Sequence, residues 1–144
     1  MSEAHLRKLE AMYLGAPINR LYEPTIAVEK SAATIGLRVR PELFHAAGSV
    51  HGSVIFKLLD DACFFATSSL VEDVFVVTVS FTTYLVRPVS EGQLTARGRV
   101  VHAGKNVFLA EAVVETASGK EIGRGNGSFH KSSIALSPEL GYAL

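Results

Sequence analysis

The stretch of sequence that decides the fold is SVIFKLLDDACFFATSS, residues 53–69. Ten of these seventeen residues are apolar, and on a helix they point in nearly every direction. A helix that is apolar almost all round belongs in the interior of a protein. The stretch therefore predicts a long, buried central helix, with Gly52 or Ser53 as its N-cap.

On both sides of this helix the apolar residues alternate with a period of two, which is typical of half-buried strands. We expect strands at about residues 25–29, 35–39, 77–85, 94–100, 107–116 and 122–130. The last four are expected to form an antiparallel meander, with Val77, Val79 and Phe81 on one face of its first strand. A single long helix among strands predicts an α+β fold, in which an antiparallel sheet curls around the helix.

A chain of 144 residues is expected to fold as a single domain, 1–144, with a short helix at about 3–14 and a loose C-terminal tail at about 132–144. Apolar residues make up 48% of the chain and the mean hydropathy is +0.26, although no apolar run reaches the length of a membrane span. A small monomer cannot easily bury so much apolar surface. We therefore expect an oligomer with a buried subunit interface.

The charges and the reactive residues exclude several classes of protein. Fourteen basic and fourteen acidic residues cancel, so the chain lacks the cationic field that nucleic acid or an anionic membrane requires. Charges also interrupt the first fifteen residues, unlike a signal peptide, and we expect a cytoplasmic protein. The histidines lack the spacing of metal ligands, so no metal is predicted. The lone Cys63 has apolar neighbours and is expected to be a small buried hydrophobic residue.

The candidate site is the junction HAAGSVHGS, residues 45–53, which leads into the central helix. The N–H groups at a helix start are unpaired and carry the positive end of the helix dipole. Gly52 lets another group approach that backbone closely. The junction therefore suits the binding of an oxyanion beside an apolar wall.

Two adjacent carboxylates lie two turns further along the same helix. Asp61 follows Lys57 by four residues, so the two are expected to form an ordinary ion pair. Asp60 points about 100° away from Asp61, toward the side of Phe56 and Phe64. Burial there would raise the pKa of Asp60, as suits a general base. We therefore predict that Asp60, and not Asp61, carries the chemistry.

The chain resembles the PaaI-like hotdog-fold acyl-CoA thioesterases at these residues. The pattern of that family is Asn-x-x-Gly-x-x-His-Gly-Gly in the loop, followed by Leu-x-Asp on the central helix. The likeness covers most of the chain and includes the turn at residues 102–105. The matching positions are Gly48, His51, Gly52, Leu58, Asp60 and Thr78. The chain departs from the pattern at His45, which replaces the Asn, and at Ser53, which replaces the second Gly.

The resemblance implies a hotdog fold, with an antiparallel sheet of five to six strands wrapped around the long central helix. It implies an acyl-CoA thioesterase without a cofactor, in which Asp60 is the general base or nucleophile and the Gly52 N–H polarises the thioester carbonyl. His51 is then a positioning residue, and Thr78 places a hydroxyl near the attacking water. His45 can donate a hydrogen bond where the family has Asn, but it can also ionise near neutral pH.

The resemblance also implies a homodimer with shared active sites, paired into a dimer of dimers. Lys105 is the candidate for binding the phosphates of CoA, because these need cations at the rim of an apolar pocket. Phe56 and Phe64 are expected to line the acyl pocket. Aromatic, short and medium acyl groups are all compatible with such residues.

Two other functions are compatible with the same fold. A hotdog hydratase or dehydratase would pair His45 with Asp60 across an acyl chain, but the helix acid of that class falls about where Lys57 stands. A non-catalytic acyl-CoA-binding protein of this kind normally carries a DNA-binding segment, which these neutral residues do not supply.

Overall fold

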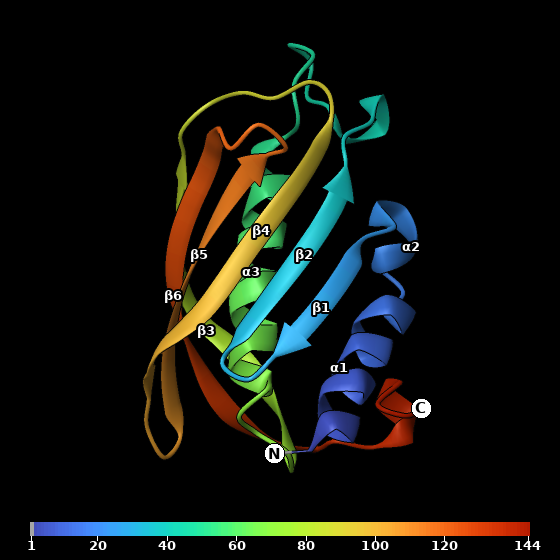
Figure 1. The fold of residues 1–144 in the computed structure, drawn as a ribbon, viewed down its shortest axis with the longest axis vertical. Coiled ribbons are helices and arrows are strands. Elements are labelled where there is room, and N and C mark those ends of the chain that lie inside the picture. The colour runs from blue at the N-terminus through green and yellow to red at the C-terminus, as the bar shows by residue number, and fades with distance from the viewer. Residues whose placement is uncertain (1) are drawn as a thin grey trace.

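The computed structural model describes residues 2–144 (Figure 1). Its helices are α1 (Glu3–Gly15), α2 (Asn19–Tyr22) and α3 (Gly52–Ser68), with 3₁₀ turns at Pro41–Leu43 and Pro138–Leu140. Its strands are β1 (Thr25–Glu29), β2 (Ala32–Arg38), β3 (Val74–Leu85), β4 (Gln93–Ala103), β5 (Val107–Thr116) and β6 (Glu121–Ala135). The six strands form one antiparallel sheet in the order β1-β2-β4-β5-β6-β3. The predicted α+β class and hotdog fold are confirmed.

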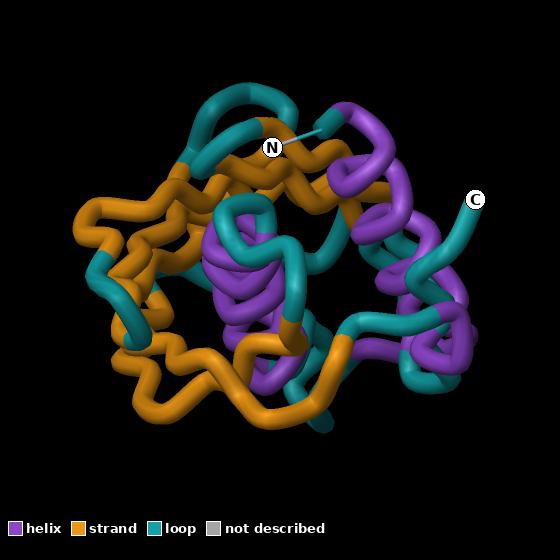
Figure 2. The backbone as a smooth tube through the Cα atoms, turned by 90° about the horizontal axis from the view of Figure 1, so that it is seen from below, coloured by secondary structure: helices purple, strands orange, loops and turns teal. Residues whose placement is uncertain are grey.

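The sheet curves around α3, as Figure 2 shows in a view along the helix. The side that the sheet leaves open is covered by α1, α2 and the C-terminal residues (Figures 1 and 2). Leu58, Leu59 and Ala62 of α3 are fully or almost fully buried. The central helix is therefore the core of the fold, as its sequence predicts.

The predicted four-strand meander is wrong at its first strand. Strands β4, β5 and β6 do follow one another as neighbours, but β3 pairs with β6 at the far edge of the sheet. The connection over residues 86–92 is too long for a tight hairpin. Val89 accepts a hydrogen bond from Val50, and Gly92 accepts one from Val39. The connection therefore passes the start of α3 and begins β4 beside β2.

The prediction that Val77, Val79 and Phe81 share one face of β3 is also wrong in part, because the strand contains a bulge. The pairing with β6 shifts between Thr78 and Ser80, so the alternation of faces is interrupted there. Val79 is 57% exposed, although it was expected on the same face as Phe81. Thr78 and Phe81 both turn toward α3 instead.

The C-terminal tail is not loose, contrary to expectation. Strand β6 continues to Ala135, and the Leu136 N–H donates to the Asp73 carbonyl. His5 Nε2 lies 2.9 Å from the Ser68 carbonyl, which can only accept, so His5 Nδ1 accepts from the Tyr142 hydroxyl at 2.7 Å. These contacts tie the tail to α1 and to the end of α3.

Helix α3 approaches the sheet most closely at strand β4. A Cβ atom at Gly98 would lie 2.5 Å from the backbone carbon and oxygen of Ala62, which leaves no space for any side chain. On β6, Gly125 and Gly127 make room for the ring of Phe81 on the neighbouring strand β3.

Gly98→Ala is expected to lower the free energy of unfolding by about 1–3 kcal/mol, the usual cost of overpacking a core. The Ala62 backbone cannot move aside as a flexible side chain could. Urea unfolding followed by circular dichroism measures the change. Gly15→Ala is the control, because nothing lies within 4 Å of its new methyl group. Equal stability of Gly98→Ala and the parent protein would contradict the close contact.

Candidate active site

The start of α3 is capped by His51, and not by Gly52 or Ser53 as expected. His51 Nδ1 accepts from the Ser53 N–H at 3.0 Å, and the His51 carbonyl accepts from the Val54 N–H at 2.9 Å. The His51 ring nitrogen thus caps the helix in the way that a Ser or Asp side-chain oxygen usually does. The Gly52 N–H has no acceptor within residues 2–144. It is available to a ligand.

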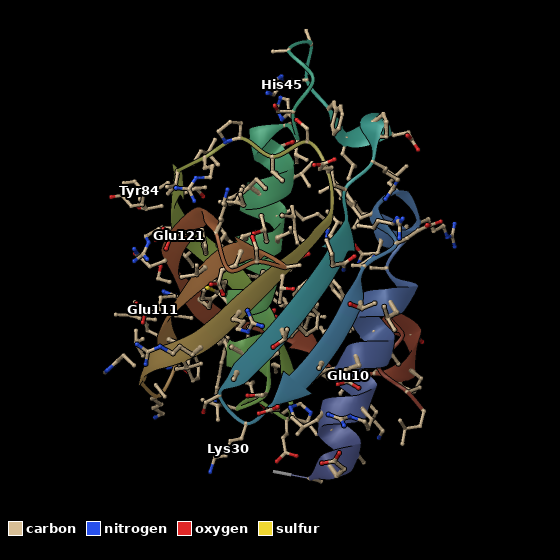
Figure 3. All side chains as sticks on the ribbon, turned by 45° about the horizontal axis from the view of Figure 1, so that its top comes forward. Glu10, Lys30, His45, Tyr84, Glu111 and Glu121 are labelled. Carbon is tan, nitrogen blue, oxygen red and sulfur yellow. The ribbon has the colours of Figure 1, made fainter. Side chains whose placement is uncertain are left out.

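A cavity of about 280 Å³ opens beside this helix start. His45 and Gly52 both line it, so the structure brings these two predicted residues together. The His45 Nδ1 accepts from the Ala47 N–H at 3.0 Å, which leaves Nε2 for another contact. Figure 3 shows His45 at the end of the molecule where α3 begins. Arg87, a cation just after the end of β3, also lines the cavity.

The Asp60 carboxylate accepts a hydrogen bond from the Thr78 hydroxyl at 2.8 Å. Burial raises the pKa of Asp60 to about 6, the Thr78 hydrogen bond lowers it, Asp61 raises it and Lys57 lowers it. The bulge in β3 makes this contact possible, because it turns Thr78 toward the helix. Asp60 is thus ionised at neutral pH yet basic enough to accept a proton, which is the property of a general base.

Aromatic side chains surround Asp60 on its strip of α3. Phe56 and Phe64 lie one helical turn before and after it on the same face. The Phe56 ring centroid is 5.6 Å from that of Phe81, and the Phe64 centroid is 5.3 Å from that of Phe75. Phe56 is 40% exposed. The strip around the carboxylate is therefore apolar and partly accessible.

Within one chain these features lie in two separate places. Eight residues of helix separate Gly52 from Asp60 by about 12 Å along the axis, and Asp60 is not part of the cavity lining. Lys105 is exposed in the β4–β5 turn, at the opposite end of the sheet from the start of α3 (Figure 1). A single chain therefore does not unite the carboxylate, the helix-start N–H and the lysine.

The other helix carboxylate, Asp61, lies in a different environment. Its Oδ2 is 2.5 Å from Lys57 Nζ, so the expected ion pair is confirmed. The same oxygen accepts from the Tyr13 hydroxyl at 2.7 Å. The sequence did not predict this role of Tyr13. Helix periodicity places the tyrosine on a helix face, but it does not show that the hydroxyl contacts Asp61, 48 residues away.

Within residues 2–144, no three His, Cys, Asp or Glu side chains converge as the ligands of a metal ion would. In the same residues, no helix is long and apolar enough to cross a membrane. Cys63 is fully buried, and burial raises the pKa of its thiol. It is the small buried hydrophobic residue that the sequence predicts.

Residues 47–122, from the loop before α3 to the first residues of β6, match the family model of the thioesterase superfamily. The chain belongs to this superfamily. The match includes the helix start, Asp60 and Thr78, and it agrees with the predicted resemblance to PaaI-like hotdog thioesterases. A protein of Saccharolobus solfataricus that is named as an esterase is 25% identical over 73% of this chain and 75% of its own.

Solved structures of other hotdog proteins have the same architecture as this superfamily member. The PaaI protein of the E. coli phenylacetic acid degradation operon superposes with a TM-score of 0.85 at 22% identity, over 94% of this chain and 99% of its own. A conserved protein of Pseudomonas aeruginosa has a TM-score of 0.76 at 27% identity, over 81% and 94%. A thioesterase of Haemophilus influenzae has a TM-score of 0.78 at 20% identity, over 87% and 88%.

Asp60→Asn is expected to raise the melting temperature at pH 8 and to change it little at pH 4. Because the folded-state pKa of Asp60 is raised to about 6, mainly by burial, the carboxyl costs stability as the pH rises through that value. An amide removes this cost and can still accept from Thr78. Scanning calorimetry at both pH values measures the difference.

The control for this measurement is Glu91→Gln, which changes an exposed carboxylate and should have the same effect at both pH values. A melting temperature of Asp60→Asn that is unchanged or lower at pH 8 would show that burial does not raise the pKa of Asp60.

Proposed function

We propose that this superfamily member is an acyl-CoA thioesterase that hydrolyses a CoA thioester to the free acid and CoA. The observation that carries the proposal is the Asp60 carboxylate, which is half-buried, held by Thr78 and flanked by aromatic rings on the central helix. The second support is Gly52, which lines a cavity at the positive end of α3 and whose N–H has no intrahelical acceptor at this first helical position. Together these groups supply a base and an oxyanion donor.

In the general-base route, the Gly52 N–H donates to the thioester carbonyl oxygen while Asp60 accepts a proton from water. The water oxygen bonds to the carbonyl carbon, and the helix start stabilises the negative charge that develops on the carbonyl oxygen. The C–S bond then breaks, and the CoA sulfur receives the proton from Asp60. In the nucleophilic route, Asp60 attacks the carbonyl carbon itself, CoA leaves, and water hydrolyses the resulting anhydride. Both routes use the same two groups.

The proposed active site is shared between two copies of the chain. Strand β3 is an edge of the sheet, so its outer N–H and C=O groups have no strand partner within residues 2–144. Its exposed apolar residues include Val77, Val79 and Leu85. Pairing of β3 with the same strand of a second copy buries these residues and satisfies the edge. It supports a homodimer in which the Asp60 half-site of one protomer meets the Gly52 half-site of the other.

A second apolar patch supports a dimer of dimers. Val101, Val107 and Leu109 are exposed on β4 and β5, away from the β3 edge. Pairing through β3 leaves this patch exposed, so it can contact a second dimer.

The remaining residues have proposed roles in substrate binding. Phe56 and Phe64 contact the acyl group, since they flank Asp60. His51 positions the Gly52 N–H through its cap, and His45 donates to the substrate from the same cavity. Lys105 binds the phosphates of CoA from the β4–β5 turn. Its exposure agrees with this role but also with a solvated turn lysine.

Asp60→Asn is expected to lower turnover of an acyl-CoA by about 10²- to 10⁴-fold, the usual share of a general base. Release of the free CoA thiol from a panel of acyl-CoA esters at pH 8 measures the effect. Asp61→Asn is the matched control on the neighbouring position and should reduce turnover far less. If Asp61→Asn abolished turnover and Asp60→Asn stayed active, the chemistry would belong to Asp61 and the assignment to Asp60 would be wrong.

Mixing two inactive variants is expected to restore activity, because each shared site takes one group from each subunit. Gly52→Pro removes the donating N–H, and proline is tolerated at the first position of a helix. An equal mixture of Gly52→Pro and Asp60→Asn, unfolded and refolded, forms mixed dimers in about half of the cases, each with one intact site. Activity should return to about a quarter of that of the parent protein.

Circular dichroism confirms that each variant folds, and native mass spectrometry counts the mixed dimers. The parent protein and each variant refolded alone are the controls. A mixture that contains mixed dimers and stays as inactive as its components would place the whole site within one chain.

A further inference from the structure

Lys57 lies within reach of two carboxylates but pairs with one of them. Asp60 follows it by three residues and Asp61 by four, and both spacings allow an ion pair on a helix. In the structure the ammonium contacts Asp61, while Asp60 is bound by Thr78. Helix geometry alone therefore does not determine which of the two aspartates pairs with Lys57.

Two tyrosines of the N-terminal segment hold the ammonium on the Asp61 side. Lys57 Nζ lies 5.2 Å from the ring centroid of Tyr13 and 4.9 Å from that of Tyr22, both within cation–π distance. The Tyr13 hydroxyl also donates to Asp61. The segment therefore fixes both members of the ion pair.

The tyrosines are themselves held in place. Tyr13 is 4% exposed, and its ring packs edge-on against Phe65 with 5.0 Å between centroids. The Asn19 side chain donates to the Tyr13 carbonyl at 2.7 Å. Arg40, which precedes the 3₁₀ turn after β2, donates to the carbonyls of Leu21 and Tyr22. The tyrosines thus form a preorganised cage around the ammonium.

The position of this ammonium matters because few other polar groups act on Asp60. On its own helix these are Lys57, Asp61 and the neutral thiol of Cys63, and on β3 the Thr78 hydroxyl. Tyr13 of α1 faces Asp61 and stays neutral, since burial and Asp61 raise the pKa of its hydroxyl. Strands β2, β4, β5 and β6 present aliphatic, phenyl or glycine positions to the helix: Ile35, Leu37, Ala96, Gly98, Ala110, Ala112, Gly125 and Phe129.

We propose that Tyr13, Tyr22 and Asp61 are positioning residues that hold the Lys57 ammonium away from Asp60 and so leave the catalytic carboxylate without a cationic partner. The inference rests on the proposed function of Asp60. An ammonium on Asp60 would stabilise its ionised form and weaken it as a base. The N-terminal helices are thereby part of the electrostatics of the active site.

The test is the titration of Asp60 in variants of the cage. The acid limb of the pH profile of kcat/KM and the ¹³C NMR shift of the Asp60 side-chain carboxyl both report its midpoint. Asp61→Asn frees Lys57 to pair with Asp60 and removes a neighbouring negative charge, so the midpoint should fall by about one pH unit. The double variant Lys57→Met with Asp61→Asn has no ammonium that could pair with Asp60. Its Asp60 midpoint should therefore return toward that of the parent protein.

A second variant leaves both carboxylates in place. Tyr22→Leu removes one ring of the cage, so the Asp60 midpoint should fall as Lys57 moves toward Asp60. The fall should be smaller than in Asp61→Asn. Tyr22→Phe keeps the ring and is the matched control, with an unchanged midpoint.

The two readouts separate this inference from the proposed function. A parent protein that releases no thiol from any acyl-CoA would overturn the function, while the NMR titration would still decide the inference. The inference is overturned if Asp61→Asn or Tyr22→Leu leaves the midpoint unchanged or raises it. It is also overturned if the double variant falls as far as Asp61→Asn, because the shift then does not depend on Lys57. A merely structural role would lower the melting temperature without moving the midpoint.

Discussion

The contact between helix α3 and strand β4 at Gly98 is the constraint on which the rest of the structure depends. The backbone of the strand lies so close to Ala62 that only hydrogen fits on the glycine Cα. Because side chains repeat every 3.6 residues on a helix, fixing Ala62 against the sheet fixes the direction of every other side chain on α3. Asp60 consequently faces the edge strand β3, and Asp61 faces the N-terminal helices that cover the open side of the sheet.

The angle of about 100° between consecutive helix residues places these two aspartates in different environments. Asp61 turns toward the N-terminal helices and meets Lys57 and Tyr13, which makes it a structural ion pair. Asp60 turns toward β3 and accepts a hydrogen bond from Thr78, on a helix strip flanked by Phe56 and Phe64. Burial dominates there and raises its pKa to about 6. Such a carboxylate costs stability at neutral pH, and the compact packing of α3 offsets that cost.

Much of the fold follows from local patterns. The length and all-round apolarity of residues 53–69 suffice to predict the central helix, and alternation predicts the strands around it. Two features of the fold could not be predicted from local patterns, because they depend on partners far away in the chain. Strand β3 joins β6 and not β4, and its bulge turns Thr78 inward. Alternation alone places Thr78 on the opposite face, and only the likeness to a family pointed to it.

The sequence by itself predicted the two main residues of the proposed site, a glycine at the helix start and an aspartate two turns along. It also predicted the ion pair between the second aspartate and the lysine four residues before it. Motif spacing and helix periodicity are local, so they are readable without coordinates. Only the tertiary structure decided that His51 caps the helix, that Gly52 lines a cavity from which Asp60 is absent, and that Tyr13 and Tyr22 enclose Lys57. These contacts join residues distant in sequence, and their partners are set by how the helices and the sheet pack in three dimensions.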